Sequence, residues 1–145
     1  MDEPLRTVVA GMIGGALMWM IFSTHLGLLL VFRPPRFLLQ RAVESRVISL
    51  ITTTTIVTFI AWNAFAVGMS FLSVALLDGT NEAIPLTPSP IYISVMVFIL
   101  IFLAILGLVF FRDYKIHILA ELSVFFGVIG LLIPNLVVAI HRAQL

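Results

Sequence analysis

Cysteine is absent from this chain of 145 residues. Its absence excludes disulfides, thiolate-bound metals, iron–sulfur clusters and a cysteine nucleophile. Charge is scarce too, because Asp, Glu, Lys and Arg make up only 10% of the residues and leave a formal net charge of +1. Nucleic-acid phosphates are bound by a concentrated basic surface. The composition therefore argues against nucleic acid as a partner.

Common catalytic and cofactor-binding motifs are also missing. The sequence contains no nucleophile elbow, no phosphate-binding loop and no His-Glu-x-x-His zinc helix. Glu121 is the only acidic residue inside the apolar segments, so no pair of carboxylates is available there for acid–base catalysis. We therefore expect no intrinsic enzyme activity and no dedicated metal site, although such a chain can serve as a subunit of a membrane enzyme complex.

Apolar side chains, by contrast, dominate the sequence. Hydrophobic residues make up 61% of the chain, more than a soluble core of this size can bury. They form four segments, each with at least the ~20 residues that a helix needs to cross a bilayer. We predict an all-α polytopic integral membrane protein, a single transmembrane helical domain over 1–145, with a retained first helix. The predicted spans are residues 8–32, 47–77, 91–111 and 116–140.

Basic residues are distributed unevenly over the predicted loops. Six of the eight Lys and Arg residues lie in the first and third loops, and the loop at residues 78–90 has none. Because basic loops are retained in the cytoplasm, we expect the first and third loops to be cytoplasmic. Both termini are then expected on the opposite side of the membrane.

The first loop begins with Pro34 and Pro35, which end the first helix. Apolar residues then fall on one stripe beside basic ones, and this pattern predicts a short interfacial helix between the first two spans. The arginines of this loop are candidates for binding lipid head groups, although they can also serve only to set the topology. They are Arg33, Arg36, Arg41 and Arg46.

Small residues indicate where helices approach one another. Gly11 and Gly15 have the G-x-x-x-G spacing, and Ala64 and Gly68 repeat a small-x-x-x-small spacing in the second span. We expect these four residues to lie at helix contacts. His25 lies roughly 40° from Gly11 around the helix, so it is expected on the same packing face.

One polar stripe is predicted on the fourth span. With His117 as the origin, Glu121 lies about 40° away, and Asn135 returns to roughly 0° after five turns. A carboxylate that faces lipid costs at least ~2.5 kcal/mol near the bilayer centre. We therefore expect His117, Glu121 and Asn135 to face other helices, another subunit or a water-filled cleft.

Depth places a second histidine in the same layer. His25 lies ~10 Å and Glu121 ~8 Å along their helices from the predicted cytoplasmic boundary, with Thr24 and the run Thr52 to Thr55 at comparable depth. Two histidines on different helices are a minimal set of axial haem ligands, and either can hydrogen-bond a quinone. His25 and His117 are therefore candidate ligands for a haem or a quinone. The third span has no polar side chain from Val95 to Phe111 and is expected to be the most exposed to lipid or partners.

These observations leave three functions open. The first is a small non-catalytic membrane subunit that scaffolds or assembles with other membrane proteins. The second is a membrane redox subunit that binds haem or quinone near the cytoplasmic leaflet. The third is a homo-oligomer that conducts ions or protons, since four helices enclose no pathway unless copies assemble. The expected partners are the bilayer and either other membrane subunits or further copies of the chain.

Overall fold

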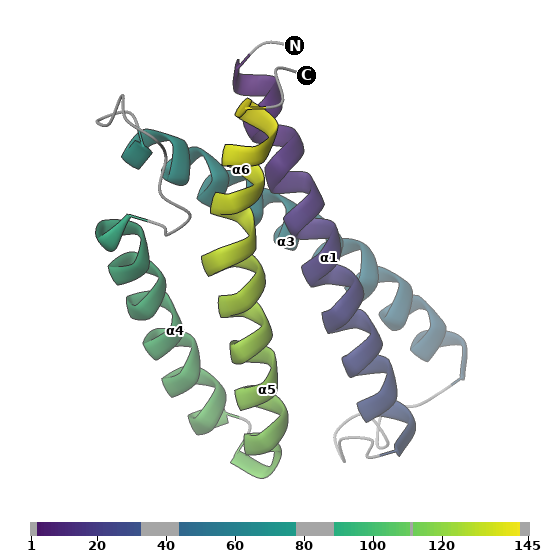
Figure 1. Cartoon of the computed structure of the whole chain (residues 1–145). Coiled ribbons are helices and arrows are strands. Elements are labelled where there is room, and N and C mark those ends of the chain that lie inside the picture. The colour runs from purple at the N-terminus through teal and green to yellow at the C-terminus, as the bar shows by residue number, and fades with distance from the viewer. Residues whose placement is uncertain (1–2, 33–43, 78–88, 111, 143–145) are drawn as a thin grey trace.

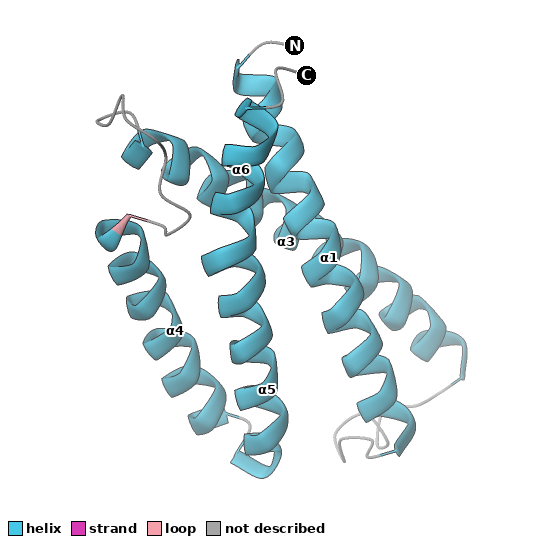
Figure 2. Cartoon of the chain, viewed as in Figure 1, coloured by secondary structure: helices cyan, strands magenta, loops and turns pink. Residues whose placement is uncertain are grey.

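A computed structural model describes residues 3–32, 44–77, 89–110 and 112–142, and regular structure in these ranges is entirely helical (Figure 2). Four of its helical segments are long and apolar enough to span a membrane: Pro4–Leu29, Ile51–Leu76, Pro90–Phe110 and Arg112–Ile140. The prediction of an all-helical protein with four candidate spans is thus confirmed. The expected interfacial helix lies outside the described residues, as do Arg33, Arg36, Arg41 and the side chain of Arg46.

The first three spans are single helices, whereas the fourth is composite. It begins with the 3₁₀ turn η1, continues through α5 and the π-helix η2, and ends in α6; we call this the fourth span. The elements are α1 (Glu3–Phe32), α3 (Glu44–Leu77), α4 (Pro90–Phe110), η1 (Arg112–Tyr114), α5 (Lys115–Phe125), η2 (Phe126–Leu132) and α6 (Ile133–Arg142).

The helices alternate in direction, so that both termini lie at one end of the bundle (Figure 1). The end of α1 and the start of α5 lie at the opposite end. Helix α3 has 34 residues, which correspond to roughly 51 Å, well beyond the ~30 Å of a hydrocarbon core. It crosses obliquely behind α1 and the fourth span, and this tilt takes up part of the excess length.

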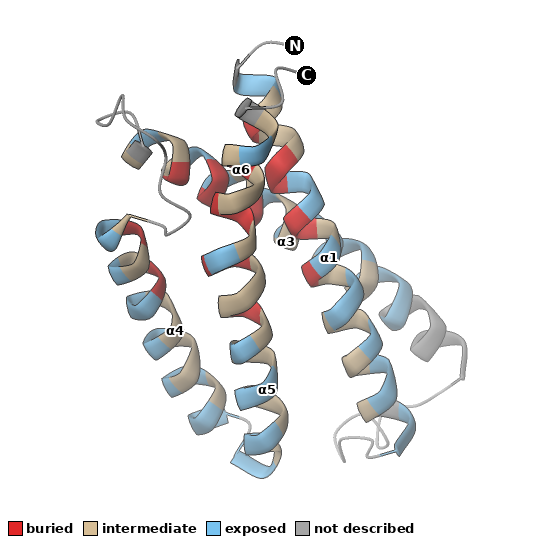
Figure 3. Cartoon of the chain, viewed as in Figure 1, coloured by how far each residue is buried: buried red, intermediate tan, exposed pale blue. Residues whose placement is uncertain are grey.

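The core lies where α1, α3 and the fourth span cross, in the half of the molecule that holds the termini (Figure 3). Its members are apolar, and Met18, Ile129 and Ile133 are completely inaccessible to solvent. Helix α4 contributes Tyr92 and Met96 to this core but is otherwise exposed: only 6% of its most apolar stretch is buried, against 22–33% for the other spans. The expectation that the third span is the most exposed agrees with this difference.

Two glycines allow α1 to pack directly on the backbone of α3. A Cβ atom at Gly15 would lie 2.7 Å from the Cα of Asn63, and one at Gly11 would lie 2.5 Å from the Cα of Val67. Both distances are too short for any side chain. The backbones therefore touch along this contact, which is the arrangement that small residues permit in membranes.

Gly11 and Gly15 do not pack against the small residues of α3. Ala64 and Gly68 are exposed, and a Cβ at Gly68 would meet nothing within 4 Å among the described atoms. Ala64 and Gly68 therefore lie outside the contact between α1 and α3, and a helix contact at these two residues stays a prediction. The face of α3 that meets α1 passes through Asn63 and Val67, each one residue, or about 100°, before the small residues.

The π-helix changes the phase of the fourth span. Hydrogen bonds of the i to i+5 type accommodate one residue more than an α-helix, so α5 and α6 differ in phase by roughly 100° from a continuous α-helix. The buried residues consequently recur every four positions, at Phe125, Ile129, Ile133 and Val137. Asn135 is rotated away from His117 and Glu121, and its amide donates to the carbonyl of Leu131 in its own helix, at 2.7 Å. The predicted stripe therefore ends before Asn135.

Candidate functional site: a histidine–glutamate–histidine cluster

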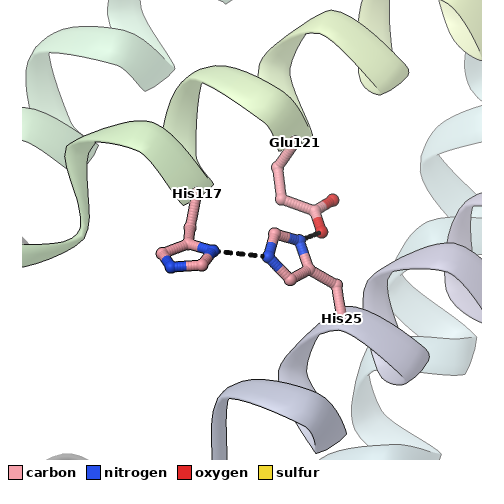
Figure 4. A network of polar contacts seen from close by, with 3 residues as sticks. All are labelled: His25, His117 and Glu121. Carbon is pink, nitrogen blue, oxygen red and sulfur yellow. Dashed lines mark hydrogen bonds and ion pairs between the residues drawn. The ribbon is translucent and has the colours of Figure 1, made fainter. Parts of the chain in front are cut away.

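Three side chains from two spans form one hydrogen-bonded series, which we call the His–Glu cluster (Figure 4). His25 of α1 lies in the middle. Its Nδ1 atom is paired with Oε1 of Glu121, and its Nε2 atom lies 2.9 Å from Nδ1 of His117. Both ring nitrogens of His25 are therefore engaged, one by a carboxylate and the other by a second imidazole.

The local helices explain why these groups meet. His117 and Glu121 are four residues apart on α5 and project from one face. Gly107 of α4 lies against the adjacent face of α5, since a Cβ there would be 2.9 Å from Ile118 Cγ2. Helix α4 thus covers the Ile118 side and leaves the polar side toward α1.

Helix α1 uses neighbouring faces for two contacts. Gly11 and Gly15 meet α3, while Gly14 meets Ile133 of α6, where a Cβ would be 2.5 Å from Cγ1. His25 lies about 20° from Gly14 around the helix. It therefore shares the face that α1 presents to the fourth span, a refinement of the expected single packing face.

The cluster is only partly shielded from solvent. The side chains of His25 and Glu121 are 24% and 22% accessible, yet Oε2 of Glu121 is buried and has no hydrogen-bond partner within the described part of the chain. A buried carboxylate oxygen is costly while it lacks a partner. This atom can therefore accept one further proton or proton donor.

Aromatic rings, including that of the core residue Phe125, lie between the cluster and the rest of the core. Phe22 precedes His25 by about one turn, and Phe125 follows Glu121 by one turn. The ring of Trp62 in α3 lies 5.9 Å from Phe22 and 5.8 Å from Phe125, and Phe65 lies 5.6 Å from Phe125, all between centroids. We call Phe22, Trp62, Phe65 and Phe125 the aromatic layer. Beyond it the buried residues of the fourth span are apolar.

The opposite side of the cluster leads to the polar end of the bundle. The ring of Tyr114 lies 6.3 Å from that of His117. Arg112, Asp113 and Lys115 surround this tyrosine in sequence and are all exposed. Besides His25 and Glu121 of the cluster itself, the titratable and charged groups next to His117 along the described chain are those of η1 and Lys115.

The imidazole contact bears on the predicted haem site. Axial ligands lie on opposite faces of a haem with the iron between them, and metal–imidazole bonds of ~2.0 Å would separate the two nitrogens by about 4 Å. The facing nitrogens of His25 and His117 are 2.9 Å apart. This contact does not fit a shared iron, and no group of three potential ligands in the described residues is arranged to hold a metal ion. A role for either histidine toward a quinone stays a prediction.

Two backbone carbonyls of α3, those of Thr54 and Thr55, accept hydrogen bonds from side chains. Thr58 donates its hydroxyl proton to the Thr54 carbonyl at 2.7 Å, and Trp19 Nε1 donates to the Thr55 carbonyl at 3.1 Å.

Sequence reasoning missed Trp19, because an indole in an apolar span resembles any other packed aromatic residue. It also missed Tyr92 of α4, whose hydroxyl donates to the Ile129 carbonyl at 2.5 Å. A proline five residues after that carbonyl was the available signal.

Comparisons with protein-family models, with curated proteins and with solved structures found no match to this chain.

Proposed function

We propose that this chain is a non-catalytic integral membrane protein that takes up and transfers a proton through the His–Glu cluster. The observation that carries the proposal is the unbroken series of Glu121, His25 and His117, held between α1 and α5 at hydrogen-bond distance. Ionisable residues inside membrane spans are expensive, and they often mark proton relays or ion sites. The unpartnered Oε2 atom of Glu121 adds a place for the transferred proton to be held.

The series can take up one proton at His117 and deliver one to Glu121, with each step moving a proton along an existing hydrogen bond. In the starting state the carboxylate is ionised, the Nδ1–H group of His25 donates to Glu121, and that of His117 donates to His25 Nε2. A proton that binds His117 at Nε2 displaces the Nδ1 proton to His25 Nε2. His25 then gives its own Nδ1 proton to Glu121. One proton enters and one carboxyl is formed, and both imidazoles end neutral in the other tautomer.

Access is proposed from one side only. The polar residues of η1 lie on the His117 side, while the aromatic layer and apolar side chains follow Glu121. A single chain therefore supports reversible proton binding rather than conduction across the whole membrane. By the distribution of basic residues, we place the open side at the cytoplasm and both termini opposite.

Infrared difference spectroscopy tests this proposal directly. The full-length protein in lipid nanodiscs is acidified stepwise, and a difference spectrum is recorded at each step. We expect a protonated-carboxyl band that is absent from Glu121→Gln. In His25→Phe the band should move, because Oε1 loses its imidazole partner.

Asp113→Asn is the matched control, because it removes an exposed acid close to the cluster. This variant should keep the band. The proposal is wrong if Glu121→Gln retains the full band, or if acidification of the wild-type protein produces no protonated-carboxyl band.

Assembly with other membrane proteins is a second candidate, and the exposure of α4 favours it. Large apolar side chains cover its outer surface, including Phe98 at 73% and Val109 at 68% accessibility. Lipid can cover the same surface, so this observation is less specific than the cluster. Native mass spectrometry after mild extraction distinguishes the two: additional subunits support assembly, and the bare 16.0 kDa mass opposes it.

A further inference from the structure

The Ile129 carbonyl lacks a backbone donor because of two neighbouring features. In an α-helix it would accept from the amide of Ile133, but that amide donates to Val128 in the π pattern. In the π pattern its donor would be residue 134, which is Pro134 and has no N–H. The hydroxyl of Tyr92 fills this position from another helix, at 2.5 Å and in a buried environment.

The segment has an alternative hydrogen-bond register in which the Ile129 carbonyl has a backbone donor and does not require the hydroxyl of Tyr92. If the Ile133 amide turned to Ile129, the turn would become α-helical and the unpaired carbonyl would be that of Gly130, which faces Pro134. Because of the proline, each register leaves one carbonyl to be satisfied from elsewhere. Tyr92 satisfies the one that arises in the π register. An unpaired carbonyl is costly inside a membrane, so the tyrosine favours that register.

We infer that Tyr92 is a positioning residue for the His–Glu cluster, acting through the register of η2. The π segment sets the rotation of α5 relative to α6, roughly 100° away from that of a continuous α-helix. With α6 seated on Gly14 through Ile133, this rotation turns His117 and Glu121 toward His25. The effect of Tyr92 on proton transfer rests on the proposed function, whereas its effect on the register does not.

Spin labels can measure the rotation, since the chain has no native cysteine to remove. Two pairs share a reference at Met20→Cys in α1, one ending at Ser123→Cys in α5 and the other at Ala139→Cys in α6; all three positions are exposed. In Tyr92→Phe we expect the distance to residue 123 to change or broaden, while the distance to residue 139 stays the same. The carboxyl band of Glu121 should move as it does in His25→Phe.

Ser94→Ala is the control, because it removes a hydroxyl from α4 that donates to the Pro90 carbonyl of its own helix, at 2.9 Å. Both distances and the band should be unchanged. Should Tyr92→Phe fail to fold, Tyr92→Phe with Pro134→Ala supplies an amide that completes either register, and the α-helical turn, which is much the commoner of the two, should then form. That variant should show the same change at residue 123.

Unchanged distances in both tyrosine variants would overturn the inference. Changed distances with an unchanged Glu121 band would overturn the positioning role and leave only a structural one. If the wild-type band never appears, the proposed function fails, while the distances still decide the register. The two failures are therefore distinguishable.

Discussion

At the scale of single residues, the contact between α1 and α3 depends on hydrogen atoms at two positions. The Cβ of an alanine at Gly15 would fall 2.7 Å from a backbone atom of α3. Backbone atoms cannot yield as the end of a flexible side chain can. The whole of α1, including His25, would have to move away from α3.

Gly15→Ala should therefore destabilise the bundle by roughly 1–3 kcal/mol, the usual cost of overpacking. Gly27→Ala on the same helix is the control, because no atom of the described residues would lie within 4 Å of its Cβ. It should be neutral or stabilising by up to about 1 kcal/mol through helix propensity. Reversible unfolding in detergent micelles measures both, and equal effects at the two glycines would contradict the direct backbone contact.

At the scale of secondary-structure elements, the fourth span depends on a hydrogen bond from α4. Tyr92→Phe leaves the Ile129 carbonyl unpaired and should cost about 1–3 kcal/mol of unfolding free energy. Pro134→Ala restores an amide that can complete either register, so the same tyrosine substitution should cost markedly less in that background. A double-mutant cycle measured by unfolding tests this coupling. Equal costs in both backgrounds would show that the hydroxyl and the proline are independent.

The same span shows where prediction from sequence reached its limit. The spacing of His117 and Glu121 placed both on one helix face, and helix depth placed His25 in their layer, because these arguments use short stretches of regular helix. The argument for Asn135 ran through 18 residues at a constant 100° and failed at the π-helix. Pro134 was visible in the sequence, but its effect depends on a hydroxyl from α4. That contact is tertiary, and the residues around Pro134 do not identify Tyr92 as the donor.

For the contact between α1 and α3, only the surface of α1 could be predicted from the sequence. The glycines of α1 could be recognised because a close approach requires small residues. Their partner surface on α3 contains Asn63 and Val67, which are not small, since only one of two touching helices needs to lack side chains. The small pair Ala64 and Gly68 therefore does not mark the surface of α3 that meets α1. Spacing identifies a helix that can be approached closely, but it does not identify the approaching surface.

At the scale of the whole molecule, the arrangement of the helices implies that opposite ends are reached from opposite sides of the membrane. Single cysteines at Pro4 and Asp113, both exposed, report this in intact cells. A membrane-impermeant maleimide should label Pro4→Cys from outside, and Asp113→Cys only after the cells are opened. Labelling of both from one side would contradict the topology. The reverse pattern would keep the topology and invert the proposed direction of proton access.

The π-helix at residues 126–132 also determines how the fourth span would respond to the deletion of one codon. A π-helix accommodates one residue more than the α-helix that could replace it. Loss of one codon inside this segment, such as that of Gly127, would shorten the turn and leave the flanking faces of α5 and α6 in phase. Loss of a codon elsewhere in the span would rotate everything beyond it by about 100°. A one-residue deletion in this segment should therefore keep the rotation of α5 relative to α6, whereas a deletion elsewhere in the fourth span should not.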